Sequence, residues 1–369
     1  MFFSITGHQD RRFPNNYQLD NLWFNCDAGW QRNGDRFYKG YKDNYCAINV
    51  NEELVAVDHS KPRSFPMWFR HGIITNLHPG AWKKTCADDS LAIKYTGEIV
   101  AGKLDLDLSV STAILSVDQA VDQIMQLLNQ STEDLFNYRN KNLKLFCTGG
   151  LDTFLLYGML SAYGVEFELI KDEHYELDDF VQRNQPALDL YWSYNRKQMH
   201  HWTRPTWLAT GACGDEYFLR GPAVIAILTA WHNINFGQLL SQNTQAYHYH
   251  HFNKYQELWN TSWTNRRELQ EKYPTRELLN QHIVDHLLND YQHWHLGEVI
   301  TWTPFKNINL VKILLQCDIQ ELLLQLLDGQ INKRLIEQYS PNVLDFLSTY
   351  KNYNYKEKLP DFFTWHEQK

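Results

Sequence analysis

The sequence predicts an α/β protein in which a parallel-sheet domain with a helical C-terminal part follows a smaller, β-rich domain. Between about residues 143 and 230, short apolar strands alternate with helical segments, which is typical of parallel α/β sheets. Two of these strands run into glycine turns that open apolar helices. In roughly the first 110 residues, short runs of strand-forming residues are separated by Asn, Asp and Gly clusters, which indicates a β-rich layer.

Length and composition favour two domains and a small substrate. A chain of 369 residues is long enough for two cores, and we expect domains at residues 1–112 and 113–369. The formal charge of −8 argues against a nucleic-acid or membrane surface, because either would normally carry clustered Lys and Arg. The 13 Trp are more than a core needs, so we expect some to line a pocket or an interface, and a homodimer is compatible with this composition.

Cysteine spacing and hydropathy indicate a cytoplasmic protein. The six Cys have neither a Cys-x-x-Cys motif nor a regular spacing, so we expect reduced thiols rather than a zinc site or a disulfide framework. The first residues have no basic segment followed by an apolar one, and no apolar run reaches about 18 residues.

The strands expected in the N-terminal part are Met1–Ile5, Tyr45–Val50, Leu54–Asp58, Met67–Arg70 and Leu91–Glu98. The stretch from Leu54 to Phe69 contains a strand, a polar turn and a second, aromatic strand. This pattern predicts a β-hairpin.

The second domain is expected to begin with a helix that Ser116 caps and that ends near Gln130. A buried strand at residues 143–147 and a helix from Asp152 to Tyr163 follow, with the glycine turn between them. The elements expected next are the strand Val165–Ile170, the helices Leu177–Gln182 and Ala187–His200, the strand Thr206–Thr210, the helix Val224–Ala230 and a mostly helical remainder from Phe236 to Lys369.

The first glycine turn is a candidate anion site. Backbone N–H groups at Gly149 and Gly150 and the N-terminus of the following helix converge there, with the hydroxyls of Thr148 and Thr153 beside them. Taken alone, however, a Gly-Gly pair is more often a tight βα turn with a helix cap and no ligand. The second turn, Gly211–Glu216, follows another predicted strand, so the two turns are expected side by side at the carboxyl edge of the sheet, where open α/β folds bind ligands.

Three blocks of sequence resemble the asparagine synthetase-type PP-loop ATP pyrophosphatases. Thr148–Thr153 (Thr-Gly-Gly-Leu-Asp-Thr) is similar to the family's Ser-Gly-Gly-x-Asp-Ser signature. Thr210–Phe218 resembles the second block, Ser-Gly-Glu-Gly-Ser/Ala-Asp-Glu-x-Phe. The third block resembles the family's Val-Pro-Phe…Lys…Leu…Pro order and comprises Thr303–Phe305, Asn309–Leu315, Asn332–Leu335 and Pro341. The resemblance covers roughly residues 110 to 360 and implies an adenine nucleotide alpha hydrolase-like (PP-loop) sheet domain.

The N-terminal part resembles, more weakly, a shortened Ntn-type glutaminase domain. Asp58, Pro62-Arg63 and Trp68-Phe69 are similar to a hairpin motif of that domain. The family's nucleophile is a cysteine directly after the initiator Met, whereas this chain has Phe2, and the nearest cysteine is Cys26. We therefore expect a degenerate domain that does not hydrolyse glutamine.

The resemblance implies an ATP-dependent, AMP-forming amide ligase, of the asparagine synthetase or β-lactam synthetase type. A carboxylate would be activated as an acyl-adenylate and transferred to ammonia or a small amine. ATP and Mg²⁺ are the implied cofactors, and Asp152 with Asp215 would hold the metal, because hard cations prefer oxygen ligands. The residues implied to bind the cofactor are Thr148, Gly149, Gly150, Leu151, Asp152, Thr153 and Gly211. Of these, Thr148, Gly149, Gly150 and Thr153 would hold the pyrophosphate.

Other residues of the implied site have competing explanations. Asp152 also suits a helix N-terminus, where a carboxylate contributes about 0.3–1 kcal/mol. Glu216 is either catalytic or a structural residue of its turn. The family's phosphate-contacting lysine corresponds to Lys356 or Lys351, with Lys358 as a competitor, although each also suits a solvated charge run.

The largest departure from the family is Ala212, which stands where the family has the glutamate that orients or deprotonates the incoming nucleophile. Cys213, Glu216 and His174 are candidates to replace it. Two alternative functions stay open: a PP-loop enzyme that adenylates a nucleobase or tRNA, and a non-catalytic nucleotide-binding protein. His282 and His286, four residues apart on a predicted helix, could also bind zinc, but no His-Glu-x-x-His motif accompanies them.

Overall fold

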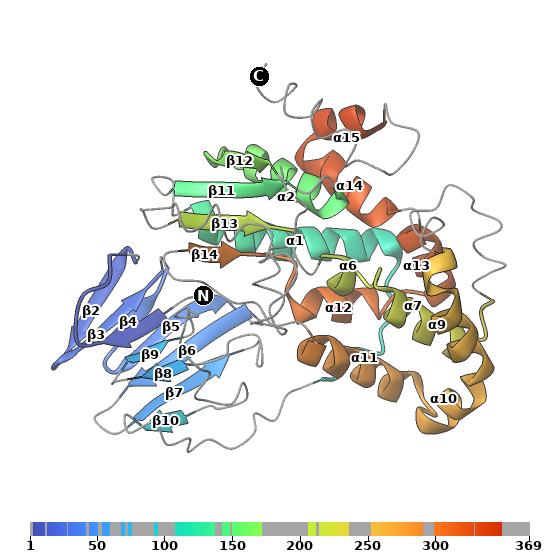
Figure 1. The fold of residues 1–369 in the computed structure, drawn as a ribbon, viewed down its shortest axis with the longest axis horizontal. Helices are drawn as coiled ribbons and strands as arrows, with labels where there is room; N and C mark the ends of the chain where they lie inside the picture. Colours follow the sequence, from blue (N-terminus) through green and yellow to red (C-terminus); the bar gives the residue numbers. More distant parts are fainter. Residues whose placement is uncertain are drawn as a thin grey trace, which may run out of the picture.

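The computed structural model of the protein describes residues 3–11, 13–27, 29–41, 44–50, 54–59, 68–70, 73–75, 92–94, 108–136, 142–147, 150–171, 206–211, 214–235, 252–290, 299–327 and 329–348. In Figure 1 the strands of the N-terminal part lie together at one end of the molecule, and the helices and the remaining strands form the larger part beside them.

Two antiparallel sheets make up the N-terminal part. The first has the order β2-β3-β1-β9-β8 and consists of β1 (Phe3–Thr6), β2 (Asn15–Leu19), β3 (Leu22–Cys26), β8 (Trp68–Arg70) and β9 (Ile73–Thr75). The second has the order β10-β7-β6-β5-β4 and consists of β4 (Gln31–Asn33), β5 (Arg36–Tyr41), β6 (Asn44–Val50), β7 (Leu54–His59) and β10 (Ala92–Lys94). Buried aromatic rings join the sheets: Phe24 of β3 stacks on Phe37 of β5 with ring centroids 3.8 Å apart.

The predicted hairpin between Leu54 and Phe69 is wrong. β7 pairs with β6 and β10, whereas β8 pairs with β9 in the other sheet. The partner of β7 is the preceding strand, which a short connection brings alongside so that Val50 faces Val55. Apolar alternation identified both strands but carried no information on which neighbour each one pairs with.

A four-stranded parallel sheet forms the centre of the larger part. Its strands are β11 (Asn142–Cys147), β12 (Glu168–Lys171), β13 (Thr206–Thr210) and β14 (Val299–Trp302), in the order β12-β11-β13-β14, and every pairing is parallel. The expected α/β organisation with a β-rich N-terminal part is therefore confirmed. The strand expected at 165–170 begins only at Glu168, and β14 was not predicted.

The first helix of the larger part, α1 (Val117–Phe136), begins with a capping box. The Ser116 hydroxyl accepts a hydrogen bond from the Gln119 N–H (3.2 Å), and the Gln119 side chain accepts one from the Ser116 N–H (3.0 Å). The predicted cap is thus correct, but the helix continues beyond Gln130. Its second half still buries apolar side chains, including Leu135, against the core.

A buried helix, α2 (Leu151–Ala162), follows β11, and short helices make up most of the described residues beyond it. These are α6 (Gly214–Tyr217), α7 (Pro222–Trp231), α9 (Phe252–Thr264), α10 (Arg266–Lys272), α11 (Arg276–Asp290), α12 (Ile308–Leu314), α13 (Ile319–Leu327), α14 (Gln330–Tyr339) and α15 (Pro341–Ser348). Except for α10, which has no buried residue, these helices join α1, α2 and the parallel sheet in one core. The helices predicted at 177–182 and 187–200 lie outside the described residues.

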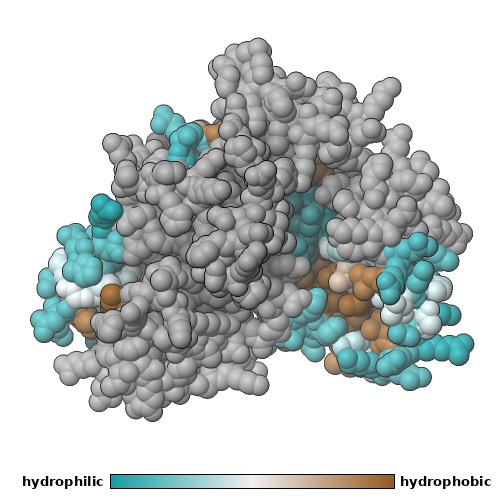
Figure 2. Space-filling view, viewed as in Figure 1, coloured by the Kyte–Doolittle hydropathy of each residue, from teal (hydrophilic) through white to brown (hydrophobic). Residues whose placement is uncertain are grey.

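The described surface is hydrophilic over β2–β4 and over α9 and α10 (Figure 2). A hydrophobic area is visible in the region where Figure 1 shows α7, α11 and α12. No helix in the part of the chain that the structure describes is both long and apolar enough to cross a bilayer.

Candidate functional site

The two glycine turns meet at the carboxyl end of the parallel sheet. Phe146 at the end of β11 faces Thr210 at the end of β13, so the segments that follow these strands leave the sheet next to each other. A Cβ atom at Gly211 would lie 3.1 Å from the Cβ of Asp152, and one at Gly214 would overlap the Asp152 carboxylate. The predicted juxtaposition of the turns is confirmed, and it requires residues without side chains in the second turn.

The strand order places these turns at a topological switch point. From β11 the chain adds β12 on one side of the sheet, and it then crosses to add β13 on the other side. In open α/β sheets the crevice at such a reversal, outside the carboxyl ends of the strands, is where ligands bind. β11 and β13 are the two strands that border it, and α2 and α6 follow them.

Arg220 links the two acidic residues of this edge. Its Nη2 donates a hydrogen bond to Oδ1 of Asp152 (2.5 Å) and forms an ion pair with Oδ1 of Asp215 (2.9 Å). The side chain of Arg220 is 1% exposed, that of Asp152 is 13% exposed and that of Asp215 is 43% exposed. The cluster therefore has a buried ion pair on one side and a solvent-facing carboxylate on the other.

The backbone after α6 holds Arg220 in position. The Arg220 N–H donates to the Asp215 carbonyl (2.6 Å), and the Leu219 N–H donates to the Glu216 carbonyl (3.0 Å), the hydrogen-bond pattern of a Schellman motif. Leu219 has φ +58°, a left-handed conformation that costs a residue other than Gly about 1–2 kcal/mol. Leu219 is fully buried, so core packing offsets this cost and fixes the turn that presents Arg220.

A residue from the C-terminal helices completes the cluster. Asn332 on α14 donates from Nδ2 to the same Oδ1 of Asp152, at 2.8 Å. α14 packs along α2, and it begins directly after Gly329, which has φ +62°. A Cβ at Gly329 would lie 2.6 Å from the side chain of Leu151, so this glycine allows the two helices to start close together.

The electrostatics of Asp152 reflect its burial and its partners. Burial raises the pKa of Asp152 to about 7; the Arg220 guanidinium opposes the rise, while the charges of Asp215 and Glu216 add to it. Asn332 also favours the ionised form through its hydrogen bond. Such a perturbed carboxyl at the carboxyl edge of a sheet is typical of functional sites, although structural ion pairs produce it as well.

The other predicted site residues are described only in part. Leu151 is buried in the core, so only its backbone faces the turn. The hydroxyl of Thr153 donates to the carbonyl of Gly150 (2.8 Å), so this hydroxyl is bonded within its own turn. Glu216 is half-buried on α6 beside Asp215. Outside the described residues lie Thr148, Gly149, His174, Ala212, Cys213, Lys351, Lys356 and Lys358.

As a pair, Asp152 and Asp215 do not fit the expected Mg²⁺ ion. Oδ1 of Asp152 already accepts hydrogen bonds from Arg220 and Asn332, and the oxygen of Asp215 that faces it contacts the same guanidinium nitrogen. Within the described ranges, no group of three His, Cys, Asp or Glu side chains is arranged to hold a metal ion. The arrangement provides a carboxylate that an arginine neutralises, with only Asp215 facing solvent.

Arg220 is the site residue that sequence reasoning missed, and Asn332 was noticed only as part of a resembling block. The signal for Arg220 was present, because it follows the second acidic turn by a few residues. It is the one charged residue in a stretch from Tyr217 to Leu228 that is otherwise apolar apart from Gly221 and Pro222. A charged residue within an apolar run is rarely buried unless it is paired.

The histidines of α11 are involved in ring packing. The His282 ring stacks on Tyr273 with centroids 4.6 Å apart, and the rings of His282 and His286 are 6.3 Å apart. Burial lowers the pKa of His282, and His286 adds to the effect. This geometry gives His282 a structural contact within the helical part.

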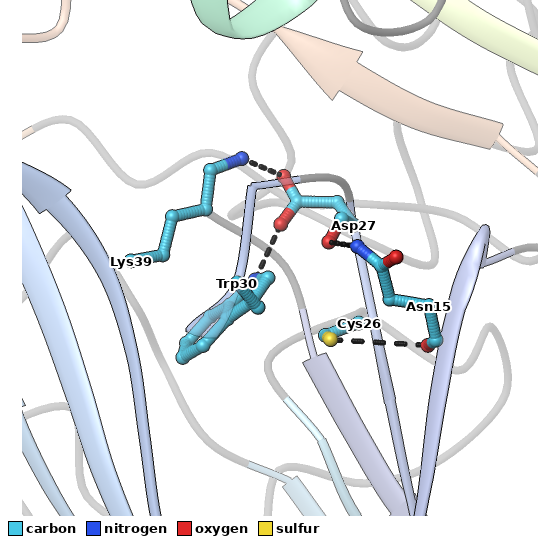
Figure 3. Close-up of polar contacts among 5 residues, drawn as sticks. All are labelled: Asn15, Cys26, Asp27, Trp30 and Lys39. Carbon is cyan, nitrogen blue, oxygen red and sulfur yellow. Dashed lines mark hydrogen bonds and ion pairs between the residues drawn. The ribbon is translucent and has the colours of Figure 1, made fainter. Parts of the chain in front are cut away.

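A second buried ion pair lies in the N-terminal sheets (Figure 3). Lys39 Nζ contacts Asp27 Oδ2 at 2.9 Å, and Trp30 Nε1 donates to Asp27 Oδ1 at 2.5 Å. The neighbouring Cys26 is fully buried, with Sγ 3.8 Å from the carbonyl of Asn15, and burial raises its thiol pKa. A buried, protonated thiol is a poor nucleophile, so Cys26 is not placed as a reactive cysteine.

Comparison of the chain with protein-family models and with curated protein sequences gives no match.

Proposed function

We propose that the protein is an ATP-dependent, AMP-forming ligase that activates a carboxylate and transfers it to ammonia or a small amine. The observation that carries the proposal is the meeting of two glycine turns at the switch point of the parallel sheet, each followed by a helix with an acidic residue in its first turn. In this proposal the four-stranded sheet is of the PP-loop type, and the N-terminal sheets are a glutaminase-like domain without its nucleophile.

The proposed reaction has two steps. An oxygen of the substrate carboxylate attacks the α-phosphorus of ATP and pyrophosphate leaves; the amine then attacks the acyl carbon and AMP leaves. Negative charge grows on the departing pyrophosphate, so fixed donors are needed there. The N-terminus of α2 can supply them, because Gly150 provides no side chain to cap the first N–H groups.

The side chains take separate roles in this proposal. Asp152, held by Arg220 and Asn332, fixes the start of α2 against the second turn. Asp215 presents its carboxylate to solvent and is the group that a cation accompanying the nucleotide would meet. Glu216 and the expected phosphate-contacting lysines, Lys351 or Lys356, stay part of the proposal on the sequence resemblance alone.

Exchange of labelled pyrophosphate into ATP tests the proposal, because it requires adenylation but no acceptor. We expect exchange with at least one acid of a panel of amino acids and other small carboxylates. Asp152→Asn should reduce it at least about 100-fold, within the range that positioned electrostatic groups contribute. Asp122→Asn, an exposed position on α1, is the control. Exchange that folded Asp152→Asn retains would contradict the assignment.

A second candidate, a nucleotide-binding protein without turnover, is favoured by the engagement of Asp152 with Arg220 and Asn332 and by Ala212 in place of the family's glutamate. Calorimetric ATP binding that is lost in Asp152→Asn, combined with no exchange over the whole panel, would establish this candidate and remove the ligase.

A further inference from the structure

One guanidinium nitrogen occupies the space between two carboxylates at the sheet edge. Nη2 of Arg220 lies 2.5 Å from Oδ1 of Asp152 and 2.9 Å from Oδ1 of Asp215. A divalent cation that bridged these residues would have to stand in the same place. We propose that Arg220 is the resident cation of this site, and that Asp152 is its anionic partner rather than a metal ligand.

Oδ1 of Asp152, the oxygen that contacts Arg220, already has two hydrogen-bond donors. Oδ1 of Asp152 accepts hydrogen bonds from Arg220 and from Asn332, and the second donor comes from a different helix at 2.8 Å. A metal ion on this oxygen would have to displace Arg220, or displace Asn332 and stand beside the guanidinium charge. The two donors come from separate parts of the chain, so it is the tertiary fold that gives the Asp152 carboxylate its hydrogen bonds.

The chain around Arg220 is built to keep it there. Two backbone hydrogen bonds close the turn after α6, and Leu219 is held in a left-handed conformation that glycine would adopt without strain. The guanidinium also lies 5.9 Å from the centroid of the Phe218 ring. Because its backbone is fixed and its side chain is 1% exposed, Arg220 cannot turn into solvent without opening the turn.

Asp152 and Asp215 have different roles in this arrangement. Asp152 serves the internal guanidinium, whereas the side chain of Asp215 is 43% exposed and can still meet a cation from solvent. This inference depends on the contacts of Arg220 and does not rest on the ligase proposal, so it stands if the protein proves not to form an adenylate.

Binding of Mn²⁺ in the absence of nucleotide, followed by the electron paramagnetic resonance of the free ion at neutral pH, tests the inference. Arg220→Met removes the charge and keeps the volume, so we expect it to bind Mn²⁺ at least about tenfold more tightly than the wild type. Adding Asp152→Asn to Arg220→Met should remove this gain. In the wild-type background, Asp152→Asn should leave Mn²⁺ binding unchanged, as should the surface control Asp122→Asn.

Two results would overturn the inference. Weakening of Mn²⁺ binding by about tenfold on Asp152→Asn in the wild-type background would make Asp152 a ligand with Arg220 present. No gain in folded Arg220→Met would mean that Arg220 does not occupy a cation position. If circular dichroism shows Arg220→Met to be unfolded, the near-isosteric Asp152→Asn variant decides: unchanged binding supports the inference and weaker binding refutes it.

Discussion

Replacing Arg220 by methionine should destabilise the protein mainly through Asp152. The substitution removes the positive partner of a carboxylate that is only 13% exposed. Charges centred about 4 Å apart attract by about 4 kcal/mol at an effective dielectric constant of 20, and breaking a buried pair by removing one partner costs about 3–5 kcal/mol. Protonation of Asp152 limits the loss, because burial raises the pKa of this carboxyl and Arg220 is the group that opposes the rise. We therefore expect a loss of about 2–3 kcal/mol at neutral pH.

The two contacts of Arg220 should differ in strength. Asp215 is 43% exposed, so water screens its charge, and its coupling to Arg220 should be below about 0.5 kcal/mol. The coupling between Arg220 and Asp152 should reach about 2 kcal/mol. Double-mutant cycles that combine Arg220→Met with Asp152→Asn or with Asp215→Asn measure both values.

Hydrogen exchange of peptides from α2 is the appropriate measurement for these cycles. It reports the opening free energy of the unit that contains Asp152, so unfolding of the N-terminal sheets does not enter the result. Equal coupling for both carboxylates, or a coupling below about 0.5 kcal/mol for Asp152, would refute the account of Arg220 as the partner of a buried charge.

Three further substitutions or conditions test other parts of the structure. Gly214→Ala should lower the unfolding free energy by about 1–3 kcal/mol, because the new Cβ would overlap the Asp152 carboxylate. Gly7→Ala is the control: a Cβ there has no atom within 4 Å, so thermal melts should show almost no change. Lys39→Met should lower the unfolding free energy by about 3–5 kcal/mol in urea denaturation, because it removes the lysine that neutralises the buried Asp27 carboxylate. Adding Asp27→Asn should recover most of that loss, and equal stability of the single and double variants would contradict the pairing. Burial lowers the pKa of His232 from 6.5 to about 4, so the folded state holds this imidazole neutral. The resulting contribution to folding stability, at most about 2 kcal/mol after allowance for solvent, should be fully present above pH 6.5 and should decline towards pH 4. If His232→Gln leaves the pH profile of the melting temperature unchanged, this contribution is excluded.

The sequence predicted the parts of the fold that depend on local pattern. Apolar runs followed by glycines identified β11 and β13, and the helical spacing after each turn identified α2 and α7. Because both strands were expected in one parallel sheet, the meeting of their turns could be predicted as well, and the overlap between Gly214 and Asp152 confirms it.

Features that depend on distant partners could not be predicted. β8 and β9 pair in a sheet with β1 through contacts that no local pattern specifies. β14 is a short run whose only strand partner in the described part of the chain, β13, lies far away in the sequence. A short apolar segment of this kind does not distinguish a strand from a helix.

In the candidate site, too, local pattern predicted some features, whereas those that depend on distant residues could not be predicted. The turns that carry Asp152 and Asp215 were found because glycines mark strand ends, whereas the roles expected of the two carboxylates were implied by the family resemblance. The role of Arg220 depends on a left-handed Leu219, and leucine gives no indication of such a conformation in a sequence. Nothing local to Asn332 indicates that its amide reaches a carboxylate at the start of α2.

The contact between Asp152 and Asn332 also has a consequence for synthesis of the chain. These residues are 180 positions apart, so a ribosome that has released α2 and the parallel strands must still add α14 before the amide can reach the carboxylate. Domains fold as they are made, N-terminal parts first. During synthesis Asp152 therefore lacks its hydrogen bond from Asn332. The site becomes complete only when the C-terminal helices have emerged and packed against α2.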